Sequence, residues 1–186
     1  MKNQLFRSSI LSTALLLGGG AAQAFAQFAA TGTTTVSVAV APESAIQVNT
    51  ATTSLTEASG PTIFGAPFTG TTNFAYKIRT TKVGGTGAIT VKITADFGAG
   101  GPSVTTPPTG DAMTYSCTAT SGTACTGPIT ASAAAATPVA TFGTDAHSAA
   151  GAAASDSGTV VWSLPNDPIY KTGTYTATAT FTISAT

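Results

Sequence analysis

The amino-acid sequence predicts an all-β protein, and three observations support this prediction. Several segments alternate apolar with small polar residues, which is typical of a half-buried strand because successive side chains point to opposite faces of a sheet. Runs rich in glycine and proline separate these segments, as turns do. Alanine-rich stretches at residues 133–136 and 149–154 have helix-forming composition, but glycine and proline interrupt that region. We therefore expect one antiparallel, immunoglobulin-like β-sandwich domain over residues 27–186.

Residues 1–26 have the organisation of a secretory signal peptide. Two basic residues precede an apolar run at residues 10–17, and small residues follow it. Small-x-small cleavage sites end at Ala24 and at Ala26, and the choice between them stays open. The apolar run is shorter than the roughly 20 residues that a membrane-spanning helix needs. We expect a protein that is secreted or held at the cell surface, with no membrane span in the mature chain.

Charged residues are scarce in this chain. They make up 8% of it, against about 25% in an ordinary soluble domain. After the predicted leader, five basic and seven acidic residues remain, for a net charge of −2. Disorder requires low hydrophobicity, whereas 42% of this chain is hydrophobic. Nucleic-acid binding requires a dense set of lysines and arginines. The composition therefore excludes both classes.

The first half of the mature chain contains three alternating segments. Residues 34–40 place Val36, Val38 and Val40 on one face and small residues on the other. Residues 73–79 and 88–94 follow the same scheme. Their inward residues are Phe74, Tyr76 and Ile78 in the first, and Ile89, Val91 and Ile93 in the second. A glycine-rich turn lies between these two segments, so we expect residues 77–81 and 88–94 to form a hairpin.

The second half contains two short strands and one long one. Short strands are predicted at residues 113–117 and near residues 138–142, the latter inside a loop-like region. The clearest alternation runs without a break over residues 174–185. Its inward set is Tyr175, Ala177, Ala179, Phe181, Ile183 and Ala185.

Cys117 and Cys125 are the only cysteines. A lone pair in an exported protein predicts a disulfide, here one that closes a small loop or hairpin. Two thiols without a nearby histidine do not complete a zinc site, so we expect no bound metal. Because the closed loop is short, the entropy gained by cross-linking is limited. We expect the bond to rigidify a tip of the fold.

Candidate catalytic residues are few. His147 is the only histidine, so a nucleophile activated by histidine would have to use it, and it lies among small loop residues. Glu43 and Glu57 are expected near strand ends, where solvated charges are common. Asp156 and Asp167 leave a calcium site open, although the alternating aspartates of a calcium loop are missing. We therefore expect a protein that is not an enzyme and that uses no cofactor.

Most of the mature positive charge falls on the predicted hairpin, where we expect one face to carry Lys77, Arg79, Lys82 and Lys92. Two interpretations stay open: a solvated face that opposes edge aggregation, or a weak site for an anionic glycan or wall polymer. Trp162 has a similar pair of interpretations. It either stacks on sugar, as Tyr170 or Tyr175 would, or belongs to the core.

The C-terminal segment resembles the last strand of several exported bacterial β-sandwich proteins. Gly173 is the fourteenth residue from the end and precedes an alternating strand, as in fimbrial pilins. The Gly-x-Tyr sequence that ends at Tyr175 is similar to the ending of spore-coat-U-type proteins and to the closing strand of wall-binding WxL domains. Residues 181–183 stand where the Trp-x-Leu of WxL domains would be. Two features depart from pilins: Ala185 replaces a common aromatic residue, and the cysteines lie in mid-chain.

Together, these features predict a structural or adhesive surface protein, and the resemblance implies a fimbrial or coat subunit. Residues 28–40 and the C-terminal segment are the elements that can assemble by β-strand addition with other copies or other surface subunits. The residues concerned are Val36, Val38, Val40, Gly173, Tyr175, Phe181 and Ile183. The simpler expectation is that residues 28–40 close their own sheet. The alternative function is a non-catalytic module that binds cell-wall or extracellular polysaccharide.

Overall fold

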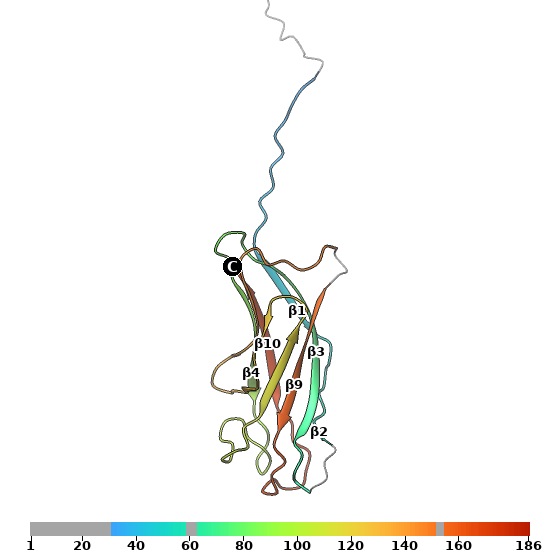
Figure 1. Cartoon of the computed structure of the whole chain (residues 1–186), viewed down its shortest axis with the longest axis vertical. Coiled ribbons are helices and arrows are strands. Elements are labelled where there is room, and N and C mark those ends of the chain that lie inside the picture. Colours follow the sequence, from blue (N-terminus) through green and yellow to red (C-terminus); the bar gives the residue numbers. More distant parts are fainter. Residues whose placement is uncertain (1–30, 59–62, 152–154) are drawn as a thin grey trace, which may run out of the picture. The chain divides into compact units, whose positions relative to one another are not determined.

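The computed structural model describes residues 31–58, 63–151 and 155–186 (Figure 1). These residues form strands and no helix, and they belong to two units, Met1–Ala39 and Val40–Thr186. Every strand of the described residues lies in the second unit. The predicted signal peptide lies outside the described residues. Within the described ranges, the chain has no helix with the length and apolar character needed to cross a membrane.

The strands form two antiparallel sheets. In the first sheet the order is β1-β3-β9-β5-β7, and β2 also pairs with β3. Its strands are β1 Glu43–Val48, β2 Thr56–Glu57, β3 Phe68–Arg79, β5 Thr114–Ala119, β7 Ile129–Thr130 and β9 Asp156–Leu164. The second sheet has the order β10-β4-β8-β6. Its strands are β4 Gly87–Ala95, β6 Thr123–Ala124, β8 Thr137–Phe142 and β10 Thr178–Ala185. The predicted all-β antiparallel sandwich is confirmed.

The core forms where the central strands bury alternate side chains. Phe74, Tyr76 and Ile78 of β3 are buried, as the alternation predicts, and so are the inward residues of β4. Strand β9 needs a glycine at position 158, because a Cβ there would clash with the ring of Phe74 on β3. The close approach of these two strands therefore depends on the missing side chain.

The strand predicted over residues 34–40 is wrong, because residues 31–42 form no strand. The first strand is β1, which pairs with residues 74–79 of β3. The other edge of β3 is occupied by β9 as far as Tyr76 and by residues 147–148 next to Ile78 and Arg79. An alternating sequence indicates that a segment can form a strand, but a strand also needs a free edge of another strand to pair with.

The predicted hairpin between residues 77–81 and 88–94 is also wrong. Strands β3 and β4 lie in different sheets, so their connection crosses the sandwich. Each strand has a fully buried inward face, and the two faces meet in the core. A glycine-rich turn is compatible with a hairpin within one sheet and with a crossing between sheets. The crossing is favoured because it brings the buried faces of β3 and β4 together.

The last strand begins four residues later than the alternation predicts. Strand β10 pairs with β4, and its first residue, Thr178, lies opposite Ala95, the last residue of β4. Beyond Ala95 there is no strand for residues 174–177 to pair with. The short strands predicted at residues 113–117 and 138–142 correspond to β5 and β8.

Candidate functional site

Two sheet edges meet without pairing along one side of the sandwich. Strand β1 ends the first sheet and β10 ends the second, and the two strands lie close to each other (Figure 1). We call this the β1/β10 side. Inward residues are only half-buried here: Ile46 on β1, and Ala179, Phe181, Ile183 and Ala185 on β10. The next strand, β4, buries its inward residues to 3% exposure or less. The inward residues of the two edge strands are therefore incompletely covered along the β1/β10 side.

A covalent bond joins the two sheets on the opposite side, next to their other ends. Cys117 lies in β5 of the first sheet, and Cys125 directly follows β6 of the second, where its N–H donates to the Val139 carbonyl of β8. We call this the β5/β6 side. The predicted Cys117–Cys125 disulfide is confirmed. It closes a small loop with a sequence separation of eight, as expected, and it also links β5 of the first sheet to the end of β6 in the second.

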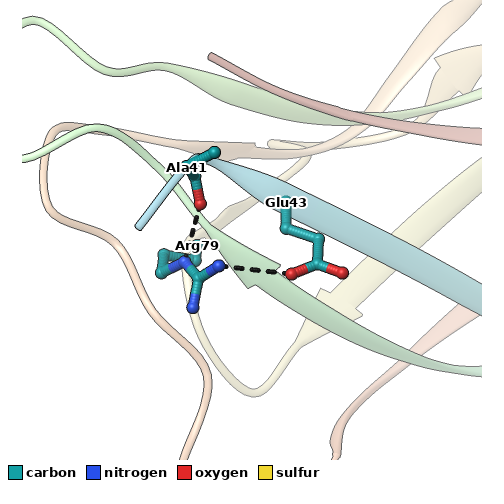
Figure 2. A network of polar contacts seen from close by, with 3 residues as sticks. All are labelled: Ala41, Glu43 and Arg79. Carbon is teal, nitrogen blue, oxygen red and sulfur yellow. Dashed lines mark hydrogen bonds and ion pairs between the residues drawn. The ribbon is translucent and has the colours of Figure 1, made fainter. Parts of the chain in front are cut away.

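An arginine holds the beginning of β1 (Figure 2). Arg79, the last residue of β3, donates from Nε to the Ala41 carbonyl at 2.9 Å and from Nη2 to Glu43 Oε2 at 3.2 Å. Because the Arg79 and Glu43 side chains are 46% and 79% exposed, the ion pair itself contributes little stability. The two contacts nevertheless fix the path by which the chain enters β1.

The N-terminal segment keeps its apolar stripe in solvent. Val36, Val38 and Val40 are 89%, 85% and 63% exposed. Smaller residues separate them, so the three valines share one face whenever the segment is extended. Exposed apolar surface of this kind is typical of interaction segments.

The other predicted assembly residues fall into two groups. Phe181 and Ile183 point inward from β10, and the Phe181 ring lies 5.7 Å from that of Phe74. Gly173 and Tyr175 precede β10, and the Tyr175 hydroxyl donates to the Lys171 carbonyl at 2.8 Å. Only the first group therefore lies on the β1/β10 side.

The four clustered cations do not share a face, so that prediction is wrong. Lys77 and Arg79 are on the outward side of β3, whereas Lys92 is on the outward side of β4 in the opposite sheet. Lys82 lies in the connection between these strands. The crossing separates residues that a hairpin would have brought together.

Trp162 belongs to the core. Its side chain is 5% exposed, its indole N–H donates to Thr72 Oγ1 at 2.8 Å, and its ring lies 5.3 Å from that of Tyr115. A sugar cannot reach this ring, so the stacking role for Trp162 is wrong and the core interpretation is confirmed.

The remaining candidate residues are scattered. His147 is exposed, with Nδ1 2.9 Å from the Asp145 carbonyl. Asp156 begins β9 and Asp167 follows its end, so they cannot bind one ion together. Across the described residues, no three histidine, cysteine or acidic residues form a group suited to a metal ion.

The sequence interpretation missed a pocket at the end of the sandwich where β3 begins and β9 ends. The pocket has a volume of about 420 Å³. Its walls include Phe64, Pro165 and Pro168, and its polar residues are Asp111, Asn166 and Asp167. The residues come from three loops between strands that are far apart in the chain, so no sequence motif predicts the site.

Two carboxylates lie next to each other in this pocket. Asp111 is 7% exposed, and its Oδ2 accepts a hydrogen bond from the Tyr170 hydroxyl at 3.0 Å. Burial raises the pKa of Asp111, and the neighbouring carboxylate of Asp167 raises that pKa further, against the lowering effect of Tyr170. Burial also raises the pKa of Tyr170, and the hydrogen bond to Asp111 adds to that rise. Two carboxyl groups and a phenol therefore lie close together at this pocket.

The chain matches no protein-family profile, no curated protein and no solved structure.

Proposed function

We propose that this protein is an exported structural subunit that assembles by β-strand addition. In this proposal, residues 34–40 of one copy extend the second sheet of another copy beyond β10. The single observation that carries the proposal is the coexistence of an exposed valine stripe and an unpaired, half-covered sheet edge in one chain. The valine stripe lacks a strand to pair with, and the sheet edge lacks a strand to cover it.

The chemistry of the two elements is complementary. An added strand forms backbone hydrogen bonds with the free edge of β10 and turns alternate side chains toward the core. Val36, Val38 and Val40 would then cover the half-buried residues Phe181 and Ile183. Neither segment carries a charged side chain, so nothing opposes the pairing electrostatically.

Two further features support export. A signal-peptide pattern precedes the segment, and the disulfide between the sheets requires an oxidising compartment for its formation. Thr and Ser, in place of Lys and Glu, occupy most outward strand positions, as on β10. The polysaccharide-binding alternative loses its original site, because the four cations are separated and Trp162 is buried.

Assembly is tested with the purified protein by size-exclusion chromatography and electron microscopy. We expect oligomers or filaments from the unaltered protein, and monomers when residues 27–41 are deleted. The double variant Val36→Asp/Val38→Asp is expected to behave like the deletion, because charges would have to enter the core of the neighbouring copy.

A matched control uses the positions between the valines. Thr35→Asp/Ser37→Asp adds the same charge to the face that points to solvent in the added strand, so it should retain assembly. Monomers from the unaltered protein at all concentrations, or equal loss of assembly in both double variants, would reject the proposal.

A further inference from the structure

The pocket between Phe64 and Asp167 has the properties of a ligand site that strand addition does not use. Its volume of about 420 Å³ is within the range of small-molecule sites, about 300–1,000 Å³. Its lining brings apolar side chains such as Phe64 and Pro165 together with the polar groups of Asp111, Asn166 and Asp167. Phe64 is 52% exposed although it lines the pocket.

Phe64 is held in an unusual conformation. Its φ angle is 59°, in the left-handed region that non-glycine residues seldom adopt. Gly65, Ala66 and Pro67 follow it along the pocket wall, and Ala66 is buried. The aromatic ring is thus presented beside the pocket instead of being withdrawn into the core.

Each carboxylate of the pair accepts one hydrogen bond from the protein and keeps further acceptor positions. One oxygen of Asp111 accepts from Tyr170, and Asp167 Oδ1 accepts from the Ile169 N–H at 2.7 Å. The Asn166 amide donates to Glu57 Oε1 at 3.0 Å and is therefore engaged elsewhere. Within the part of the chain that the structure describes, no lysine or arginine forms an ion pair with Asp111 or Asp167. Two neighbouring carboxylates repel each other unless one takes up a proton or a positively charged donor compensates them.

We propose that this pocket binds an amino sugar that carries a free, protonated amino group. The ammonium group would donate to Asp111 and Asp167, and the ring would lie against Phe64 and the prolines Pro165 and Pro168. Ring hydroxyls would donate to the carboxylate oxygens that remain. An open pocket at the end of a sandwich is reachable by a sugar unit within a polymer, which suits an adhesive surface protein. The inference does not depend on strand addition, since the pocket and the β1/β10 side share no residue.

The binding test uses the glucosamine tetramer as the probe, at pH 6, with isothermal titration calorimetry and amide NMR shifts. We expect saturable binding with shifts centred on residues 64–67 and 165–168. The N-acetylated tetramer is the comparison ligand, because it keeps the ring and loses the positive charge. It should bind at least 10-fold more weakly.

Variants test which residues carry the binding. Asp167→Asn keeps the side-chain shape and the acceptor for the Ile169 N–H, and it should weaken tetramer binding about 10-fold or more through loss of a charged partner. Phe64→Ala should weaken it several-fold. The control is Ile63→Ala, an exposed neighbour that does not line the pocket and should change affinity less than about twofold.

Several outcomes would overturn the inference. These are no binding of either tetramer, equal binding of the two tetramers, or binding that Asp167→Asn leaves intact in a protein with unchanged melting behaviour. Tighter binding of Nα-acetyl-lysine amide than of glucosamine would assign the pocket to a protein side chain instead. The same shifts produced by calcium chloride alone would assign it to a cation.

Discussion

The two sides of the sandwich close in different ways. On the β5/β6 side a disulfide joins the sheets, and Val139 and Ala140 of β8 are essentially inaccessible. On the β1/β10 side the sheet edges lie close without pairing, and inward residues stay half-exposed. Inward edge residues are half-buried on the β5/β6 side as well, at Cys117, Ala119 and Cys125, so the two sides differ in their covalent link and not in burial. The difference shows which side of the sandwich is held by a covalent bond and which side relies on packing alone.

The largest expected effect compares two isoleucines that lie opposite each other. Ile89 of β4 pairs with Ile183 of β10, and Ile89 is fully buried while Ile183 is not. Ile89→Ala should lower the free energy of unfolding by about 3–4 kcal/mol, because it leaves a cavity in a closed core. Ile183→Ala should cost only about 1 kcal/mol in the monomer, where less surface leaves water.

The comparison is measured by urea denaturation of both variants, first as monomers and then under assembling conditions. In assemblies the cost of Ile183→Ala should rise toward that of Ile89→Ala. Equal costs in the monomer would show that the β1/β10 side is already closed, which would contradict the account.

Removal of the disulfide should have the next largest effect. The double variant Cys117→Ser/Cys125→Ser is expected to lose about 2–3 kcal/mol, as estimated for a loop with a sequence separation of eight residues. Since the bond joins the two sheets, hydrogen exchange should quicken in β5, β6 and β8 and stay unchanged in β10. Faster exchange in β10 to the same degree would mean that the two sides are not independent.

A smaller effect is expected in the connection from β4 to β5, which links the two sides. The Asp96 carboxylate accepts hydrogen bonds from the N–H groups of Val104 and Thr105 and from the Ser103 hydroxyl. Burial raises its pKa, but these hydrogen bonds outweigh burial, and the pKa lies well below its ordinary value. The folded pKa is thus below the unfolded value of about 3.9. Stability from Asp96 is therefore present above about pH 4 and is lost as the pH falls further.

The corresponding variant is Asp96→Ala. It should lower the free energy of unfolding by about 1–3 kcal/mol at pH 7, and the difference from the unaltered protein should shrink below about pH 4. Chemical denaturation at a series of pH values measures both. A difference that is constant from pH 7 to pH 2 would show that the carboxylate charge does not hold this connection.

The sequence correctly predicted features that depend on local periodicity. It did not predict features that depend on contacts with residues far away in the chain. The inward sets of β3, β4 and β10 followed from alternation, and the disulfide followed from the lone cysteine pair. The sheet to which β4 belongs could not be predicted from the sequence, because a glycine-rich turn permits both a hairpin within one sheet and a crossing to the other sheet. Residues 34–40 alternate as clearly as β3 does, yet they form no strand within this chain. The pocket escaped notice because Asp111 and Asp167 are separated by more than fifty residues and share no motif.

The central claim is that residues 34–40 of one copy pair with β10 of another. A photoreactive amino acid placed at position 38, in an equal mixture of isotopically heavy and light protein, tests it directly by mass spectrometry of the cross-linked peptides. The account predicts mixed heavy–light cross-links from position 38 to residues 178–185. Cross-links within single copies only, or intermolecular cross-links that avoid β10, would contradict it.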